Sequence, residues 1–351
     1  MTLNGDTQSL ITSRAPAKLI PTHPADKEST QLCAQDFIGM DELLTQINLS
    51  RDQLPTLDTP SSFRFKTTRH FASNITPNDP NDPLLLQILP LTRENVTEPG
   101  FTEDPLDEAH FTAVPGLIHK YPSRVLLTVT GACAIHCRYC FRRHFDYQQN
   151  LPSLEKLEQM RRYIQSQPKI NEVILSGGDP LVLTDQALIE LLRFFESIEQ
   201  IDTMRIHSRL PILKPSRLRS PFFKALQQSR LSAVLVIHSN HSAEIDEVCQ
   251  SELLAVKPKL SALLNQSVLL KGINDSSTVL AGISKRLFAA GVLPYYLHLL
   301  DPVQGAGHFQ IRNERAKQIY SELQLKLPGY LLPKLVQEQA GELHKSLINY
   351  P

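Results

Sequence analysis

The sequence has no excess of charge of either sign, no long apolar run and few cysteines. Its 36 lysine and arginine residues balance 36 aspartate and glutamate residues, so no basic surplus indicates a nucleic-acid partner. No apolar stretch approaches the ~20 residues of a membrane span, and the N-terminal residues lack the continuous apolar core of a signal peptide. The five cysteines are an odd number, which argues against a disulfide framework and favours a reducing cytoplasm.

Three of the five cysteines lie in one short segment. Cys133, Cys137 and Cys140 form a CxxxCxxC pattern within Gly131–His144. Three thiolates this close can bind three corners of a 4Fe-4S cluster, which leaves the fourth iron free to bind a small molecule. A zinc site is the alternative, but zinc sites usually combine a CxxC pair with a distant second pair, and this chain has no second pair. The spacing therefore favours an iron–sulfur cluster.

The rhythm of the sequence changes near residue 110. The first ~30 residues are rich in threonine, serine, proline and alanine, which predicts poor order. Between Cys33 and Leu54, apolar residues recur at roughly helical spacing, and Ile75–Pro83 is a run of turns. The sequence therefore predicts a mainly helical, loop-rich N-terminal extension over residues 1–110 and a main body over residues 111–351.

The main body alternates short apolar runs with amphipathic stretches of helical period. This alternation predicts an α/β fold of parallel strands joined by crossover helices. The crossovers could close the strands into a partial barrel or leave an open doubly wound sheet, and periodicity alone does not choose. The predicted strands contain residues 125–129, 173–175, 204–206, 234–237, 268–270 and 295–300.

Residues of unusual type follow the predicted strands. The cysteine segment follows the first strand, Ser176–Pro180 the second, Ser208–Pro211 the third and His238–Asn240 the fourth, and Asp301 ends the sixth. Parallel α/β folds carry their chemistry at the carboxyl ends of the strands. The sequence therefore predicts one shared site at that end of the sheet.

Each candidate residue also has an ordinary explanation. Gly177 and Gly178 could let the backbone approach a ligand or simply make a tight turn. A histidine after a strand, such as His238, is more often structural, although His238 and Gln266, at the expected start of the fifth strand, could both bond sugar hydroxyls. Arg142 could bind a carboxylate with two hydrogen bonds or lie on the surface.

Two lysines near the C-terminus are candidates for cofactor chemistry. A lysine in the site could form a Schiff base with pyridoxal phosphate (PLP), but most lysines are solvated. Lys345 and Lys334 are the two considered. Asp301, between an apolar run and a proline, could pair with a cation on the substrate.

Taken together, these motifs resemble the lysine 2,3-aminomutase family of radical S-adenosylmethionine (SAM) enzymes, which also use PLP. The resemblance extends from about residue 75 to the C-terminus. It implies a partial (β/α)6 radical SAM barrel with a mainly helical N-terminal extension, and a 4Fe-4S cluster, SAM and PLP as cofactors. The segments that carry it are residues 75–83, 115–125, 131–144, 175–180, 265–270, 294–297 and 305–309.

The resemblance also implies a role for each matching residue. The cluster ligands are Cys133, Cys137 and Cys140. The residues that contact SAM are Gly177, Gly178, Asp179, His238 and Gln266. The residues that hold PLP are Lys345, as the Schiff base, and Tyr121 and Arg124, near the phosphate. The residues that bind the substrate are Arg142, at the α-carboxylate, and Asp301 and Glu338, at the ε-ammonium.

The C-terminal region departs from the family pattern. The family's Schiff-base lysine follows a glycine-rich run, whereas Ala340–Lys345 contains one glycine. The spacing from Pro333 still places Lys345 at that lysine, with Lys334 as the alternative, and places Glu338 where the family has aspartate. The chain stops at Pro351 without the metal-binding tail of longer members, which favours a monomer or a weak dimer.

These features predict a cytoplasmic isomerase that converts L-α-lysine to β-lysine with an external one-electron donor. Two carboxylates favour a cationic side chain, because they would repel the γ-carboxylate of glutamate. The short form resembles the bacterial aminomutase that supplies (R)-β-lysine for modifying elongation factor P, which implies a functional link to that factor and its lysyl ligase. The alternatives are a glutamate 2,3-aminomutase, a radical SAM enzyme without PLP and an electron-carrying iron–sulfur protein without turnover.

Overall fold

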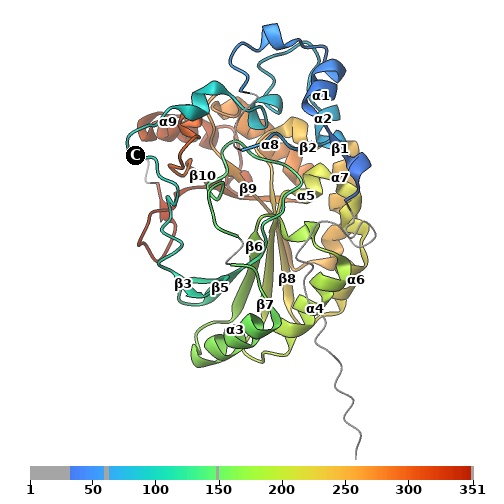
Figure 1. Ribbon diagram of the computed structural model, residues 1–351, viewed down its shortest axis with the longest axis vertical. Coiled ribbons are helices and arrows are strands. Elements are labelled where there is room, and N and C mark those ends of the chain that lie inside the picture. The colour runs from blue at the N-terminus through green and yellow to red at the C-terminus, as the bar shows by residue number, and fades with distance from the viewer. Residues whose placement is uncertain (1–31, 59–62, 148–149, 349–351) are drawn as a thin grey trace, which may run out of the picture.

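A ten-stranded sheet forms the centre of the molecule in the computed structural model, which describes residues 32–58, 63–147 and 150–348 (Figure 1). The first ~30 residues, for which the sequence predicts poor order, lie outside the described residues. Neighbouring strands in the sheet follow one another in the chain, from β3 at one edge to β12 at the other. Each connection therefore moves the chain on by one strand.

Six parallel strands make the core of this sheet, as the sequence predicts. A doubly wound sheet would reverse its strand order at a switch point, and the order here never reverses. The sheet therefore winds in one direction, as a barrel does. Within the described chain β3 and β12 do not pair with each other, so the barrel is partial. The six strands are β5 (Arg124–Thr130), β6 (Glu172–Gly177), β7 (Thr203–Ser208), β8 (Ser232–His238), β9 (Ala262–Val268) and β10 (Leu293–His298).

Short strands that the sequence pattern does not reveal extend the sheet at both edges. The hairpin of β3 (Thr112–Val114) and β4 (Leu117–Tyr121) pairs antiparallel with β5. At the other edge, β11 (Lys334–Gln337) pairs parallel with β10, and β12 (Ser346–Leu347) pairs antiparallel with β11. Strands of two to four residues are too short to produce a periodic signal.

The predicted position of the fifth strand is wrong by several residues. The sequence places its apolar run at residues 268–270, whereas β9 spans Ala262–Val268. The run is hidden because Asn265 and Ser267 are polar yet buried, where both are hydrogen-bonded to the backbone of Ser239. Gln266 consequently lies near the carboxyl end of β9, paired with His238 of β8.

Helices connect the parallel strands, and several begin at a side chain that caps them. Ser153, Thr184, Asp246 and Ser276 each accept a hydrogen bond from a backbone N–H of the first helical turn, which satisfies a donor that the helix leaves unpaired. The helices are α3 (Leu154–Ser166), α4 (Asp185–Glu196), α5 (Leu210–Leu213), α6 (Pro221–Gln228), α7 (Glu247–Val256), α8 (Ser277–Ala289) and α9 (Asn313–Gln324).

The N-terminal extension contains shorter helices than its apolar spacing predicts. Helix α1 ends at Gln46, and Asn48, two residues later, takes a left-handed conformation with φ of 55° that cannot continue a right-handed helix. The extension packs on the barrel beside α5, where the Thr68 hydroxyl donates to the carbonyl of Leu213 at 2.7 Å. Its regular elements are β1 (Phe37–Ile38), α1 (Met40–Gln46), β2 (Thr67–Thr68) and α2 (Arg69–Ser73), with 3-10 turns at residues 34–36, 51–53, 85–87 and 92–95.

The extension and the barrel share one hydrophobic core. Leu43, Phe71 and Ile88 of the extension belong to the same buried cluster as Ile206 and Ile237 of the central strands. The extension is therefore held by burial of apolar surface against the barrel. Among the described residues, none of the helices has the length and apolar character needed to cross a membrane.

Candidate functional site

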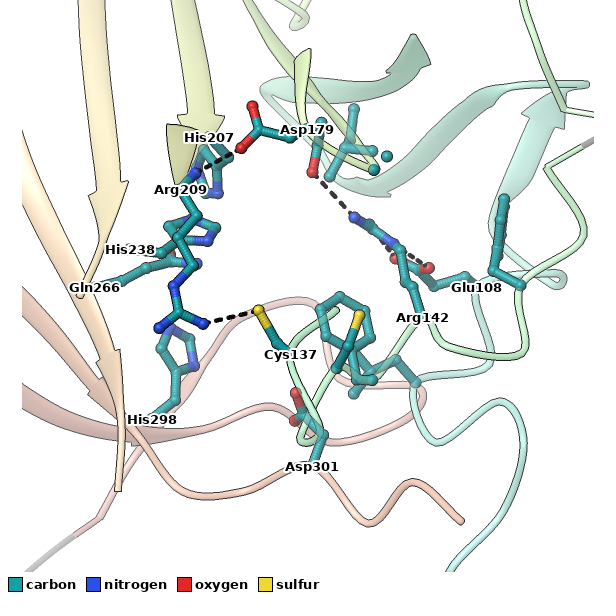
Figure 2. A pocket seen from close by; sticks show the side chains of 18 of the residues that line it. Glu108, Cys137, Arg142, Asp179, His207, Arg209, His238, Gln266, His298 and Asp301 are labelled. Carbon is teal, nitrogen blue, oxygen red and sulfur yellow. Dashed lines mark hydrogen bonds and ion pairs between the residues drawn. The ribbon is translucent and has the colours of Figure 1, made fainter. Parts of the chain in front are cut away.

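A cavity of about 420 Å³ opens at the carboxyl ends of the parallel strands. Its walls come from the loop that contains Glu108, from β4, from β5 and the segment after it, from β6 to β10 and from the segment after β11. Figure 2 shows part of this lining. Every residue that the sequence analysis assigned to the cluster, SAM, PLP or the substrate lines it. Lys334, the alternative Schiff-base lysine, is exposed and is not among the lining residues. The prediction of one shared site at this edge agrees with the structure.

The three clustered cysteines line one wall of the cavity as free thiols. Burial, together with the charge on Cys137, raises the pKa of the Cys140 thiol to about 11, and burial raises that of Cys133. The thiolates of Cys133 and Cys140 are thus disfavoured by burial and by the other thiols nearby, and binding to cationic iron would offset both effects. Three thiol donors facing one cavity fit a cluster with one open iron.

A single metal ion is a poorer fit to these thiols. Zinc needs its ligands about 2.0–2.3 Å from one point. In the part of the chain that the structure describes, no three His, Cys, Asp or Glu side chains lie close enough together to hold one ion. A four-iron cube separates its ligands by its own width and does not need three sulfurs that converge on one point.

The cysteine loop, Gly131–His144, is held by the N-terminal extension. Glu94 accepts from Arg138 at 2.8 and 2.5 Å and from Arg143 at 2.9 Å, and the Arg138 and Glu94 side chains are 0% and 4% exposed. Backbone bonds from His136 to the carbonyl of Lys66 and from Arg138 to that of Gln87 add to this contact. In the sequence, the arginines of the cysteine loop were the sign that could have predicted this contact, because arginines that become buried require acidic partners.

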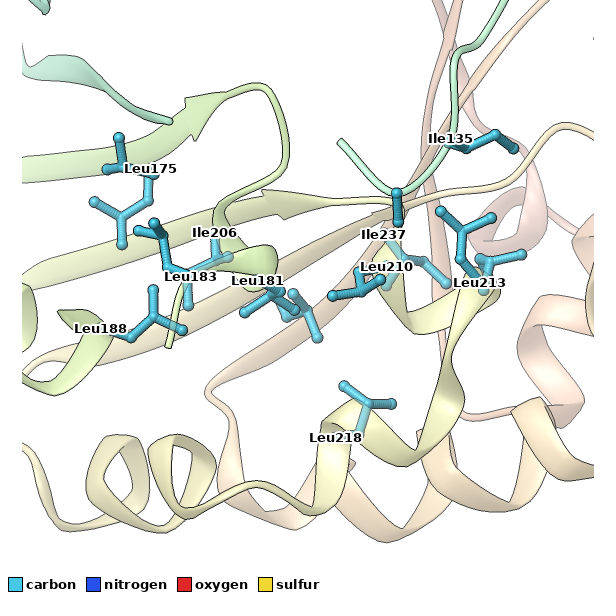
Figure 3. Close-up of a cluster of buried hydrophobic side chains, with 14 of the residues drawn as sticks. Ile135, Leu175, Leu181, Leu183, Leu188, Ile206, Leu210, Leu213, Leu218 and Ile237 are labelled. Carbon is cyan, nitrogen blue, oxygen red and sulfur yellow. The ribbon is translucent and has the colours of Figure 1, made fainter. Parts of the chain in front are cut away.

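The hydrophobic core also anchors the cysteine loop. Ile135 belongs to the buried cluster that includes Leu210, Leu213 and Ile237, and it lies near the end of this cluster in Figure 3. The loop therefore reaches the barrel through an apolar contact and the extension through ion pairs.

The structure explains the glycines after β6 by packing. A Cβ on Gly177 would lie 2.7 Å from the carbonyl oxygen of Thr130, and one on Gly178 would lie 2.4 Å from that of Ala132. The Asp179 carboxylate accepts from the Ser208 hydroxyl and from the backbone N–H groups of Leu181, Arg209 and Leu210. Only the backbone of this segment is thus left to meet a ligand, and the carboxylate instead joins the ends of β6 and β7.

Arg142 lies in the cavity wall but already has an acidic partner. Its Nε and Nη2 donate to Glu108 at 2.7 and 2.5 Å, and its Nη1 donates to Ser176 at 3.0 Å. Although burial opposes the charge, Glu108 holds the pKa of Arg142 above its usual value. The sequence analysis missed Glu108, which stands in a loop without periodic pattern. The outer edge of the guanidinium still has N–H groups for a second carboxylate.

Three histidines, of which His298 is buried and His207 and His238 are half-buried, face the cavity opposite Arg142 (Figure 2). Burial lowers the pKa of His238 and of His298 to about 3 and lowers that of His207. The Nε2 atom of each is buried without a hydrogen-bond partner in the described residues. Neutral imidazoles with a free ring nitrogen are suited to bind a polar ligand, which would satisfy these atoms.

The two acids assigned to the substrate differ in their surroundings. Asp301 is half-buried, one of its oxygens is buried without a partner within the described chain, and burial followed by the charge of Glu338 raises its pKa to about 7. Burial opposes ionisation of Glu338 too, but Lys345, Lys120 and the Tyr121 hydroxyl lower its pKa to about 2. Glu338 is thus ionised and paired, whereas Asp301 is the acid with an unused oxygen.

Glu338 connects the C-terminal segment to β4. It forms an ion pair with Lys345, and it accepts from the Tyr121 hydroxyl at 2.8 Å and from Lys120 at 3.2 Å. Lys120 also donates to the carbonyl of Gln339 at 3.0 Å. Side chains thereby link the two edges of the sheet across the cavity mouth. The sequence analysis did not identify Lys120.

Arg124 is a positive group at this end of the cavity that has no acidic partner among the described residues. Its guanidinium lies 4.1 Å from the ring centre of Tyr121. Arg205, a second cavity arginine, is instead paired with Glu172 at 2.5 Å. Arg124 is therefore the guanidinium most available to bind an anion such as a phosphate.

Comparison with known proteins gives consistent matches. The model of the Radical SAM superfamily matches residues 127–219. The L-lysine 2,3-aminomutase of Escherichia coli (strain K12) is 44% identical over 87% of this chain and 90% of its own length. The protein of that name from Haemophilus influenzae is 43% identical over 87% of this chain and 90% of its own length. The L-lysine 2,3-aminomutase of Clostridium subterminale is 34% identical over 80% of this chain and 67% of its own length.

Proposed function

The chain belongs to the L-lysine 2,3-aminomutase family of the radical SAM superfamily, and we propose that it converts L-α-lysine to β-lysine with PLP as a cofactor. Membership makes it an isomerase and implies a 4Fe-4S cluster and SAM. One observation supports the substrate most directly: Asp301 and Glu338, two carboxylates, line the cavity that also contains the three thiols and Lys345.

Cys133, Cys137 and Cys140 would hold the cluster, and the backbone at Gly177 and Gly178, with His238 and Gln266, would hold SAM. When bound, the cluster and SAM supply an organic radical that can remove hydrogen from an unactivated carbon. The protein contributes a cavity with a largely apolar lining, which limits the access of water to this chemistry.

Lys345 would bind PLP as a Schiff base, with Arg124 and Tyr121 near the phosphate. When bound, PLP supplies a carbonyl carbon and a conjugated ring, which would allow the substrate's own amino nitrogen to migrate between neighbouring carbons. Glu338 lies against the Lys345 ammonium and would position that side chain. In the overall reaction the amino group moves from Cα to Cβ while a hydrogen moves from Cβ to Cα, so the isomerisation needs no net oxidant.

The substrate would be held at both ends. The free edge of Arg142 would bind the α-carboxylate, and the unpaired oxygen of Asp301 would accept the ε-ammonium. An ammonium next to Asp301 favours the ionised carboxylate. An acid at this position favours lysine over glutamate, whose γ-carboxylate it would repel.

The test is an anaerobic reaction of the reconstituted full chain with SAM, PLP, a one-electron reductant and L-lysine, with products separated by chiral chromatography. We expect β-lysine from the wild type and from Lys334→Arg. Lys345→Arg keeps the charge but not the Schiff base, and it should reduce turnover by a factor on the order of 10² to 10⁴ and remove the visible absorbance of lysine-bound PLP. Cleaved SAM without β-lysine would retain the radical chemistry and reject lysine as the substrate.

We further propose that the product is (R)-β-lysine, made in the cytoplasm and used to modify elongation factor P. The support is similarity in size and sequence to the short bacterial aminomutases, and the five free cysteines agree with a reducing compartment. The chiral separation decides the handedness. The link to elongation factor P is tested by offering the product to the lysyl ligase of that factor. Transfer to the factor would support the link, and a ligase that does not use this product would contradict it.

A further inference from the structure

Arg209 connects the end of a barrel strand to one of the cluster cysteines. It follows β7, and its backbone N–H donates to the Asp179 carboxylate at 2.8 Å. Its side chain, which is 5% exposed, extends along the cavity wall past His207 and His238 to the cysteine loop (Figure 2). The backbone anchor and the burial leave the side chain little freedom to point elsewhere.

The guanidinium of Arg209 is fixed by groups from three parts of the chain. Nη1 donates to the Cys137 sulfur at 2.8 Å and to the Tyr139 hydroxyl at 2.6 Å. Nη2 donates to Gln87 of the extension at 2.7 Å and to Glu244, after β8, at 3.1 Å. Such a planar fork can join a thiol and a carboxylate at the same time, which a lysine ammonium cannot do with the same geometry.

The charges around Cys137 are arranged as an oriented pair. The positive guanidinium stands next to the sulfur, and its counter-ion Glu244, which is 0% exposed, lies at its other edge. Glu244 is itself held by the backbone N–H groups of Asn240 and His241. The Arg209–Glu244 pair therefore has its positive charge on the side of Cys137. Because the pair is buried, solvent screens this charge little.

We propose that Arg209 is a positioning residue that sets the reduction potential of the cluster through its hydrogen bond to Cys137. Hydrogen bonds to the ligand sulfurs and the local charge are among the factors that set the potential of iron–sulfur clusters. A donor beside the sulfur stabilises the reduced cluster, which carries one more negative charge, and so raises the potential. Glu244 offsets part of this effect. The proposal rests on the proposed cluster site and is independent of the substrate.

The test is an anaerobic redox titration of the reconstituted full chain, followed by electron paramagnetic resonance of the reduced cluster, with no SAM or lysine present. Arg209→Lys should lower the midpoint potential enough to reduce the ratio of reduced to oxidised cluster about tenfold at a fixed potential, or about 59 mV for one electron. Glu244→Gln should shift the potential in the opposite direction, because it leaves the guanidinium charge uncompensated.

Arg217→Lys is the matched control. Arg217 is also a buried arginine with an acidic partner, Asp185, but it does not line the cavity. This variant should lose stability and keep the wild-type potential. Unchanged potentials in Arg209→Lys and Glu244→Gln at normal iron content would overturn the proposal, as would loss of the cluster from both. If only Arg209→Lys loses iron, the Glu244→Gln variant tests the proposal alone: a raised midpoint potential would support it, and a lowered or unchanged one would overturn it. Absence of β-lysine would count against the proposed substrate but would not affect these titrations.

Discussion

The two segments that would hold the cofactors, the cysteine loop and the C-terminal segment Glu338–Leu347, are built in different ways. In the cysteine loop, Arg138 is fully buried and paired, and Ile135 lies in the core. In the C-terminal segment, residues 339–344 are exposed, and Leu343 is 57% exposed. Only the two residues of β12 pair with the sheet.

This difference indicates how each site is formed. The cysteine loop is held in place by side chains of several other segments, among them Glu94, Glu108 and Arg209. The position of Lys345 depends largely on one carboxylate, Glu338. We therefore expect the first region to respond strongly to substitution of its buried partners and the second to tolerate changes in its backbone.

The largest expected effect is in the cysteine loop. Glu94→Gln removes the charge that pairs with both Arg138 and Arg143, and breaking a buried pair costs about 3–5 kcal/mol. We expect that loss in the free energy of unfolding, measured by denaturant titration, together with reduced iron retention. Glu42→Gln is the control, because the Glu42–Arg69 pair is about half exposed and exposed ion pairs contribute little to stability. Equal effects in the two variants would show that the loop does not depend on Glu94.

An intermediate effect is expected at Asp301, which lies between the two regions. Asp301→Asn removes a charged acceptor for the ε-ammonium, worth about 1.5–3 kcal/mol, so the KM for lysine should rise about 10- to 100-fold. Because the pKa of Asp301 is raised to about 7, the wild-type carboxylate gains its charge as the pH rises through that value, and kcat/KM should rise with it. The variant should lack this rise. A rise that persists in the variant would assign it to another group.

The same pKa shift has a consequence for stability. The native state binds the Asp301 proton more tightly than the unfolded chain, whose carboxyl titrates near its ordinary value of 3.8. Stability from this group is therefore present at low pH and is lost as the pH rises toward 7. The free energy of unfolding of Asp301→Asn should decline less than that of the wild type across this range.

The smallest effect is expected in the C-terminal segment. Gly341 has a φ of +82°, and a Cβ there would meet no atom within 4 Å. Gly341→Ala should cost only the backbone penalty of about 1–2 kcal/mol and leave the affinity for PLP unchanged in an absorbance titration. Gly178→Ala is the matched glycine of the other region, where the Cβ would clash with Ala132, and it should disrupt iron binding. Loss of PLP affinity in Gly341→Ala would contradict the expectation that the C-terminal segment tolerates backbone changes better than the cysteine loop does.

Much of the site could be predicted because its residues stand in short motifs. The CxxxCxxC spacing and the position of Asp301 after an apolar run involve residues that are close together in the sequence, so they can be recognised without the structure. Glu94, Glu108 and Lys120 could not be found in this way, because their importance comes from partners at least 34 residues away in the chain. Ligand contact by Gly177 and Gly178 stays a prediction, and the structure adds a packing reason for both glycines, because an added Cβ would meet protein backbone.

The sequence by itself determined the parallel α/β class, the thiols and the set of side chains at the strand ends, because periodicity and motif spacing depend on near neighbours in the chain. Only the tertiary structure decided the single direction of winding, the extent of β9 and the ion pairs around the cysteine loop. Those features depend on which distant segments share a buried space, and a buried charge chooses its partner by proximity in the fold.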